Sequence, residues 1–151
     1  MIKATAAAAA LSGLPSTLHA LMRRRSFRSA VTYMYDTTCA AGTLVPPGRR
    51  GFARGVIVHL GISVACGDPL ARTLPHRHAV ASGAAAGLAI GVINVGVIGR
   101  LFPAIRALPL LPQLADNVMF GALFAAVLER RCSAARLHSV HVRRVRAQSA
   151  A

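Results

Sequence analysis

The chain has 151 residues, 54% of them hydrophobic, and its 18 Lys and Arg residues against 4 Asp and Glu give a formal net charge of +14. A soluble nucleic-acid-binding protein can be as basic, but its charge covers the folded surface. Here the charge is segregated, because residues 4–22, 55–71, 79–99 and 110–128 contain neither Lys nor Arg. This layout is typical of apolar membrane spans joined by basic loops, so nucleic acid is not expected as a partner.

The first apolar segment, residues 2–22, is rich in Ala and Leu and is followed directly by Arg23, Arg24 and Arg25. At about 1.5 Å per residue it is long enough to cross a hydrocarbon core of about 30 Å. An uncleaved first span fits it best. A targeting segment is the open alternative, because no acidic residue precedes Asp36.

Residues 26–45 are too polar to span a membrane. Apolar and aromatic residues recur there at helical spacing: Phe27, Val31, Met34 and Tyr35. This pattern predicts an amphipathic helix that lies in the membrane interface.

Three further apolar segments, residues 52–74, 79–101 and 111–128, each have the length of a membrane span. The predicted fold is therefore an all-α membrane protein, a bundle of about four transmembrane helices with an interfacial helix after the first. The lipid bilayer is the expected partner. Residues 131–151 form a basic tail that we expect to be flexible, with anionic lipid as a candidate partner.

Three glycines of the third span, Gly83, Gly87 and Gly91, follow one another at intervals of four residues. Small residues at this spacing allow two helix backbones to approach closely in lipid. We therefore predict that these glycines are helix-packing positions.

Polar and ionisable side chains at membrane depth are costly and are candidates for function. If the four spans are antiparallel, one leaflet holds such residues from every span: His19, His59, Asn94, Asp116 and Asn117. The functional hypothesis is that they share one polar pocket. The alternative is separate structural roles, such as an interhelical hydrogen bond of Asn94 or a helix-terminus interaction of Asp116.

No motif for catalysis is present in the sequence. The three cysteines, Cys39, Cys66 and Cys132, are far apart and have no His or Cys neighbours at a zinc-binding spacing. A nucleophile elbow, a zincin motif and a phosphate-binding loop are also absent. We therefore expect no catalytic residue, metal or cofactor.

Three segments carry a resemblance to a known family: Gly13-Leu14-Pro15-Ser16-Thr17-Leu18-His19-Ala20, Val58-His59-Leu60-Gly61 and Phe102-Pro103-Ala104-Ile105-Arg106. In these segments the chain resembles the small uncharacterised four-span integral membrane proteins of actinobacteria. The resemblance covers about residues 13–130. It implies the four-span fold and a place in the bacterial cytoplasmic membrane, and it implies no activity.

Three functions follow in order of preference. The first is an interaction or scaffold protein, such as an accessory subunit of a larger membrane complex. The second is a small homo-oligomeric transporter or channel-like protein with a polar pocket in one leaflet, and the third is a membrane enzyme. The basic residues divide evenly between the two sides of the membrane, so the orientation stays open.

Overall fold

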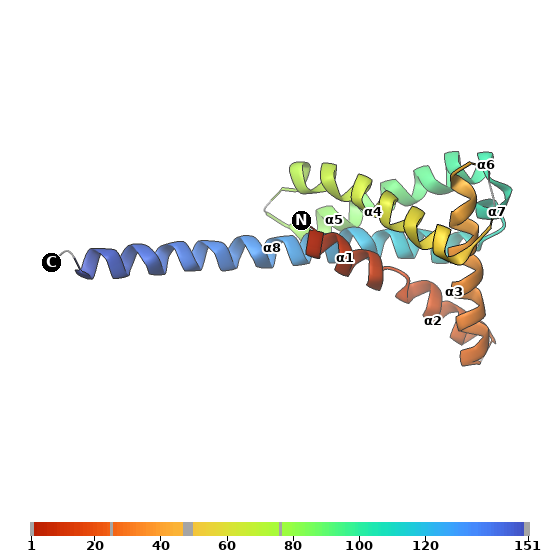
Figure 1. The fold of residues 1–151 in the computed structure, drawn as a ribbon, viewed down its shortest axis with the longest axis horizontal. Helices are drawn as coiled ribbons and strands as arrows, with labels where there is room; N and C mark the ends of the chain where they lie inside the picture. Colours follow the sequence, from red (N-terminus) through yellow and green to blue (C-terminus); the bar gives the residue numbers. More distant parts are fainter. Residues whose placement is uncertain (1, 25, 47–49, 76, 150–151) are drawn as a thin grey trace.

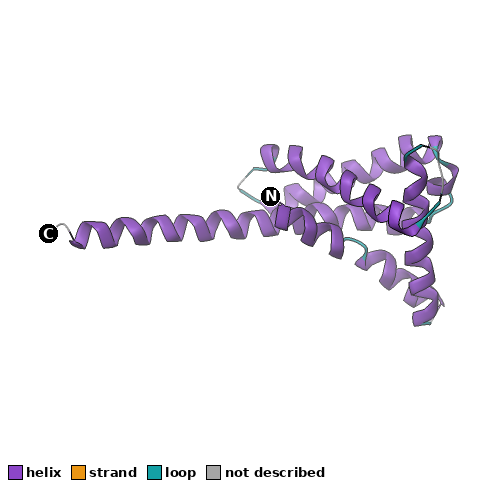
Figure 2. Cartoon of the chain, in the orientation of Figure 1, coloured by secondary structure: helices purple, strands orange, loops and turns teal. Residues whose placement is uncertain are grey.

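The computed structural model describes residues 2–24, 26–46, 50–75 and 77–149, and their side chains except those of Arg24 and of residues 131–149. The described residues are almost all helical and contain no strand (Figure 2). The elements in chain order are α1 (Ile2–Leu11), α2 (Leu14–Arg24), α3 (Phe27–Ala41), the 3₁₀ helix η1 (Gly42–Leu44), α4 (Phe52–Thr73), α5 (Ala79–Ile93), the π helix η2 (Asn94–Ile98), α6 (Gly99–Leu101), α7 (Pro103–Arg106) and α8 (Leu110–Ser149). The predicted all-α fold is confirmed.

Two helical stretches are both long and apolar enough to cross a membrane, Ala79–Leu101 and Leu110–Arg130, among the residues that the structure describes. They correspond to the predicted third and fourth spans. The first stretch combines α5, η2 and α6, and the second is the start of α8. The two run side by side in opposite directions and pack more closely than any other pair of elements (Figure 1).

Glycines make this close approach of α5 and α8 possible. A Cβ atom added at Gly83 would overlap the carbonyl oxygen of Gly121, and one added at Gly87 would overlap the carbonyl oxygen of Asn117. A Cβ atom at Gly91 would lie 3.1 Å from the Asn117 Cβ. The three glycines are buried against α8, so the helix backbones touch where any larger residue would separate them.

The apolar core lies where α1 and the end of α4 meet α8. Phe124 is fully buried and lies beside Phe120, with ring centroids 6.1 Å apart. The methyl groups of Ala4 and Ala8 from α1 and the side chain of Leu70 from α4 complete the cluster. Because α1 presents small alanine side chains here, the large phenylalanine rings of α8 fit between the two helices.

The first apolar segment is not one helix. Ser12 and Gly13 form a turn between α1 and α2, and the second helix begins just before Pro15. A proline within a continuous helix lacks a hydrogen-bond donor and clashes with the carbonyl four residues earlier, here that of Leu11. The single helix predicted over residues 2–22 is therefore wrong, because Pro15 ends α1 and starts a new helix in a different direction (Figure 1).

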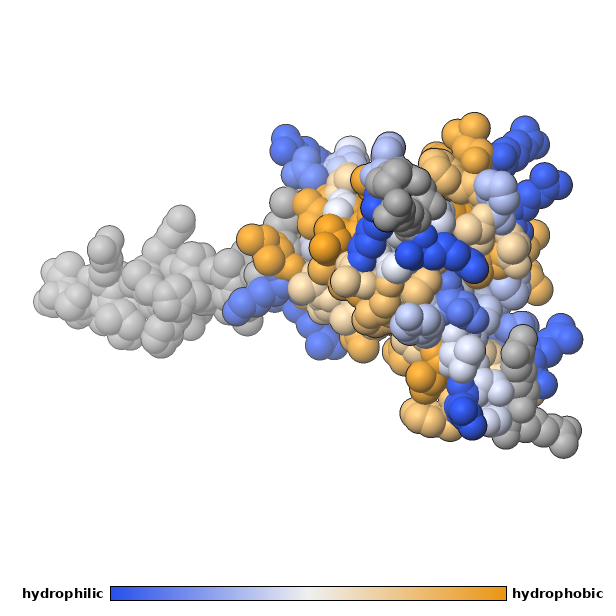
Figure 3. All heavy atoms as spheres, turned by 45° about the vertical axis from the view of Figure 1, so that its right-hand side comes forward, coloured by the Kyte–Doolittle hydropathy of each residue, from blue (hydrophilic) through white to orange (hydrophobic). Residues whose placement is uncertain are grey.

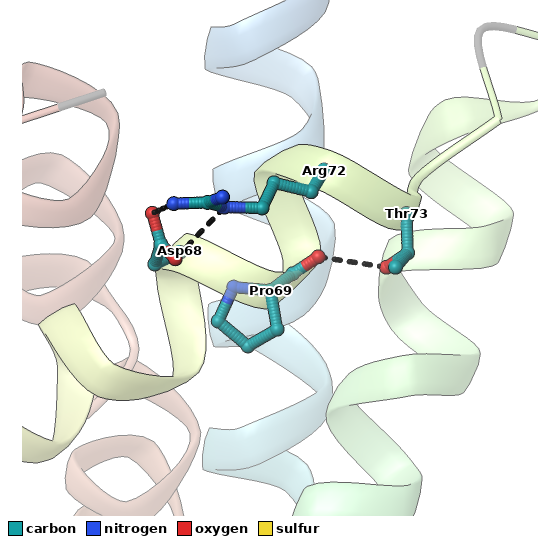
Figure 4. Close-up of polar contacts among 4 residues, drawn as sticks. All are labelled: Asp68, Pro69, Arg72 and Thr73. Atoms are coloured by element: carbon teal, nitrogen blue, oxygen red, sulfur yellow. Dashed lines mark hydrogen bonds and ion pairs between the residues drawn. The ribbon is translucent and has the colours of Figure 1, made fainter.

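Helix α4 continues through Pro69 for one more turn, which side chains hold in place (Figure 4). The guanidinium of Arg72 forms an ion pair with Asp68, with Nε 2.9 Å from Oδ2. The hydroxyl of Thr73 donates a hydrogen bond of 2.8 Å to the carbonyl of Pro69. The predicted helix over residues 52–74 is thus present, although α4 is more polar than the two span-like stretches.

Helix α3 lies across one end of the bundle, whereas α4, α5 and α8 run along its length (Figure 1). We call this the α3 end; α7 and the first turn of α4 also lie there. A Cβ atom added at Gly55 of α4 would overlap the backbone carbonyl of Thr38, so α3 and α4 touch directly. At the opposite end, α8 continues as a helix to Ser149, beyond the bundle. The predicted flexibility of residues 131–151 stays a prediction.

Large apolar side chains are exposed along the helices that form the bundle (Figure 3). On α4 and the α5 stretch they include Ile57, Leu60, Val64, Val80, Leu88, Val92, Ile93, Val97 and Leu101. Water does not favour contiguous apolar surface of this kind, whereas the acyl chains of a bilayer do.

We predict that Gly87→Leu destabilises the detergent-solubilised protein by about 1–3 kcal/mol, because the new side chain forces the backbones of α5 and α8 apart. Thermal unfolding followed by circular dichroism measures the effect.

Gly96→Leu and Gly61→Leu are the matched controls, since a Cβ atom at either position meets nothing within 4 Å. Both should leave the unfolding temperature nearly unchanged. Equal loss in all three variants would contradict the glycine contact between α5 and α8.

Candidate functional site: a polar pocket between α4 and α8

A pocket of about 520 Å³ lies between α4, the η2 segment and the first turns of α8, and the α1–α2 turn, α3 and α7 also contribute to its lining. Its polar lining comes from five parts of the chain: Ser12, Thr37, His59, Ser63, Asn94, Gln113, Asp116 and Asn117. Apolar residues, among them Val58, Ile90, Ile105 and Phe120, form the rest of its wall. The pocket is thus mixed in character, as small-molecule sites generally are.

The pocket forms because α5 and α8 pack closely against each other, whereas α4 does not pack closely against either of them. The glycines hold α5 against α8, while α4 packs chiefly on α3 and has few contacts with α5 or α8. Between Gly55 at one end of α4 and Gly67 near the other, α4 therefore stands away from α8. The side chains at this level do not fill the space between α4 and α8, and the cavity is the space that remains.

One wall of the pocket is the break between α1 and α2. The Asp116 carboxylate, from α8, accepts a hydrogen bond of 2.9 Å from the backbone N–H of Ser16. It also accepts a short hydrogen bond from the Ser16 hydroxyl. Ser16 lies in the first turn of α2, where N–H groups have no partner within the helix, so a carboxylate there both caps the helix and complements its dipole.

The other side of the break contacts His59 of α4. Its Nε2 lies 3.3 Å from the carbonyl oxygen of Ala9, in the last turn of α1. When Nε2 carries the proton it donates to this carbonyl, which has no partner within the helix. The Ser12 hydroxyl donates to the same carbonyl over 3.2 Å. Two pocket residues from different helices, His59 and Asp116, therefore contact the two ends of the break.

A chain of amide groups crosses the pocket wall from η2 to α8. The Asn94 side chain donates to the side-chain oxygen of Asn117 over 3.1 Å. The Asn117 amide in turn donates to the carbonyl of Gln113 over 2.8 Å, and the Gln113 amide donates to the carbonyl of Leu108 over 3.0 Å. Asn94 begins the π-helical segment, a deviation often found where a helix forms a site.

Tyr33 of α3 faces the same region from the α3 end. Burial of its hydroxyl raises the pKa of Tyr33, and the Asp116 carboxylate raises this pKa further, against an opposing contribution from the Ser16 hydroxyl. The phenol therefore stays protonated, and its buried hydroxyl has no hydrogen-bond partner among the described residues.

The structure brings together four of the five residues of the predicted polar cluster: His59, Asn94, Asp116 and Asn117 all line the pocket. His19 does not line it, although it follows Ser16 by less than one turn of α2. Four polar lining residues were not in the predicted cluster: Ser12, Thr37, Ser63 and Gln113. Ser16, which binds Asp116 without lining the pocket, was not in it either. Pro15-Ser16-Thr17 has the composition of a helix start, so the sequence contained a signal for Ser16.

Within the described residues, no group of three or more His, Cys, Asp or Glu side chains is arranged to hold a metal ion. Comparison of the chain with protein-family models, curated proteins and solved structures finds no match.

We predict that Ser16 and Asp116 stabilise the fold jointly. A double-mutant cycle with Ser16→Ala and Asp116→Asn should give a coupling energy of about 1 kcal/mol or more, because each replacement removes the same charged hydrogen bond. The unfolding free energy of the four detergent-solubilised forms is the measurement.

The cycle of Ser16→Ala with Asp68→Asn is the control. Asp68 pairs with Arg72 near the opposite end of the bundle, so these two effects should add. Additivity in both cycles would mean that the Ser16 hydroxyl and Asp116 do not stabilise the fold together.

Proposed function

We propose that the chain is a multi-pass protein of the bacterial cytoplasmic membrane. In this proposal α5 with η2 and α6, the first part of α8, and α4 each cross the bilayer, and α1 and α2 together form a fourth, broken crossing. A break inside a span is compatible with lipid when side chains satisfy the freed backbone groups. Asp116 and His59 make such contacts at the Ser12–Gly13 turn.

Two observations support this topology. The two span-like stretches, Ala79–Leu101 and Leu110–Arg130, pack through glycine, and the first exposes large apolar side chains along its length. Small residues inside and large apolar residues outside are the arrangement of helices packed in lipid, where association depends on close contact. We also propose that the chain is related to the four-span membrane proteins of actinobacteria that its sequence resembles.

Within the membrane we propose that the protein binds a small polar solute in its pocket and acts as a transporter or channel-like protein. The observation that supports this function is the convergence of polar groups from α4, η2 and α8 on one cavity that also borders a broken helix. Broken helices at a polar cavity are a recurrent design of solute transporters. Among the three functions expected from the sequence, the pocket favours the second.

The lining indicates what kind of solute would fit. Among the described lining residues there is no Lys or Arg, and Asp116 is the one carboxylate. Amide and hydroxyl groups supply most of the remaining polar contacts, and apolar side chains from the same helices form the rest of the lining. A small neutral or singly cationic molecule with both hydrogen-bonding and hydrocarbon groups complements this lining.

An accessory-subunit function is the second candidate, and one observation favours it. Helix α8 has 40 residues, about twice the number needed to cross a bilayer, and its second half extends beyond the bundle (Figure 1). A helix projecting in this way is available to a partner protein of a larger membrane complex.

We predict that the protein stays in the membrane pellet through washes with high salt and alkaline carbonate, and that only detergent releases it. Apolar spans hold a protein by hydrophobic contact, which salt and high pH do not remove. Immunoblotting of pellet and supernatant is the measurement, and release by salt alone would contradict the membrane assignment.

We predict that the pocket is open to water and to a bound solute in reconstituted membranes. Cys66 lines the pocket, so in a variant without the other two cysteines it should react with a water-soluble methanethiosulfonate. A panel of small amines, amides and polyols should include a compound that slows the reaction by occupying the cavity. The rate of thiol modification is the measurement.

Val64→Cys in a chain without native cysteines is the control, because Val64 lies on the exposed apolar side of α4 and does not line the pocket. It should react slowly and without protection by any compound, since a thiol in hydrocarbon forms little thiolate. Equal rates at both positions, or an unreactive Cys66, would contradict the solute-binding function.

A further inference from the structure

Helix α3 has three distinct faces, and one of them is buried against the protein. Ala30 and Ala40 are buried against the neighbouring helices. A second face carries large apolar side chains that are exposed: Phe27 at 76%, Val31 at 49%, Met34 at 44% and Tyr35 at 53%. A third face is polar and exposed, with Arg28, Thr32 and Asp36. We call the second face the α3 stripe.

The stripe is ordered and continues onto the next helix. The ring of Tyr35 stacks on that of Phe52 at the start of α4, with centroids 5.4 Å apart and planes 5° from parallel. Phe52 itself is 48% exposed. Two aromatic rings are thus held together at the surface without being covered by the protein.

The position of α3 defines the depth at which the stripe lies. If α5 and α8 cross a bilayer as proposed, α3 lies across their ends and beside α7, which joins them. This level is the headgroup region. A helix there needs one face toward protein, one toward acyl chains and one toward water, and α3 has these three faces.

Basic residues surround the stripe. Arg23 is in the last turn of α2, Arg28 is in the first turn of α3, and Arg50 lies two residues before Phe52; all three are exposed. Arg54 is used differently, since its guanidinium donates to the carbonyls of Val45 and Pro46 and so holds the loop before α4. Three arginines are therefore free to bind groups outside the protein.

We propose that the α3 stripe and these three arginines form a binding surface for anionic phospholipid. The apolar side chains enter the outer part of the acyl region, and Arg23, Arg28 and Arg50 bind the headgroup phosphates. The proposal rests on the membrane assignment. It is independent of the pocket, because none of these residues lines it.

Single tryptophans test the placement of the stripe, because the chain has no Trp of its own. In nanodiscs, Val31→Trp should be quenched by lipids brominated near the headgroup end of the chain and be shielded from iodide. Thr32→Trp, on the water side, should be quenched by iodide. If iodide quenches both Trp variants, the proposal is overturned. It is also overturned if Val31→Trp is shielded from iodide and from the brominated lipids, because a second copy of the protein would then cover the stripe.

A third variant, Val92→Trp, distinguishes failure of the α3 proposal from failure of the membrane assignment. Val92 is 56% exposed near the middle of the α5 stretch, so lipids brominated near the chain end should quench it. If Val92→Trp is quenched by these lipids and Val31→Trp by none, the spans are correct and the α3 surface is wrong. If neither is quenched, the membrane assignment itself fails.

Lipid titration of the detergent-solubilised protein tests the anionic preference. Phosphatidylglycerol should raise the unfolding temperature more than phosphatidylcholine, and inorganic phosphate at the same concentration should not. Replacing Arg23, Arg28 and Arg50 by Gln should weaken the lipid effect by roughly fivefold for each arginine removed. The same replacement of Lys3, Arg77 and Arg130, which lie toward the opposite end, is the control. Equal losses in both triple variants would overturn the assignment to α3.

Discussion

The backbone contact between α5 and α8 is the constraint on which the other parts of this fold depend. Gly83 and Gly87 meet the carbonyls of Gly121 and Asn117, so the backbones of the two helices are in direct contact. This contact determines which way α8 is turned. Phe120 and Phe124 then face α1 and α4, while Asn117 faces Asn94.

The pocket is a consequence of unequal packing around this pair. Glycine on α5 removes the space between α5 and α8, whereas α4 is held by α3 at one end and by the Phe124 cluster at the other. The middle of α4 has no such contact with α8. Polar side chains at that level therefore line a cavity, and they are satisfied chiefly by one another and by backbone groups of neighbouring turns.

The break in the first segment links the pocket to the rest of the fold. An unpaired helix end inside an apolar bundle is costly, and here it is stabilised by residues far away in sequence, Asp116 for α2 and His59 for α1. The same two residues line the pocket, so the pocket and the two ends of the break share side chains. α2 leads directly to α3, which connects the pocket with the surface that we propose for anionic lipid.

The sequence by itself determined the local features of this protein. The apolar runs predicted helices over residues 79–101 and 111–128, and the interval of four residues predicted the packing face of Gly83, Gly87 and Gly91, because both depend only on helix geometry. Helix ends and contacts between distant residues were decided by the tertiary structure. Pro15 allowed a break, but the Asp116 carboxylate that caps the new helix is 100 residues away. Depth along each span likewise suggested that His59, Asn94, Asp116 and Asn117 meet, yet it placed His19 with them. The depth of a residue in the membrane does not specify how its helix is rotated, nor the direction that a helix takes after a break. The turn at Ser12 and Gly13 redirects the chain, and His19 does not line the pocket.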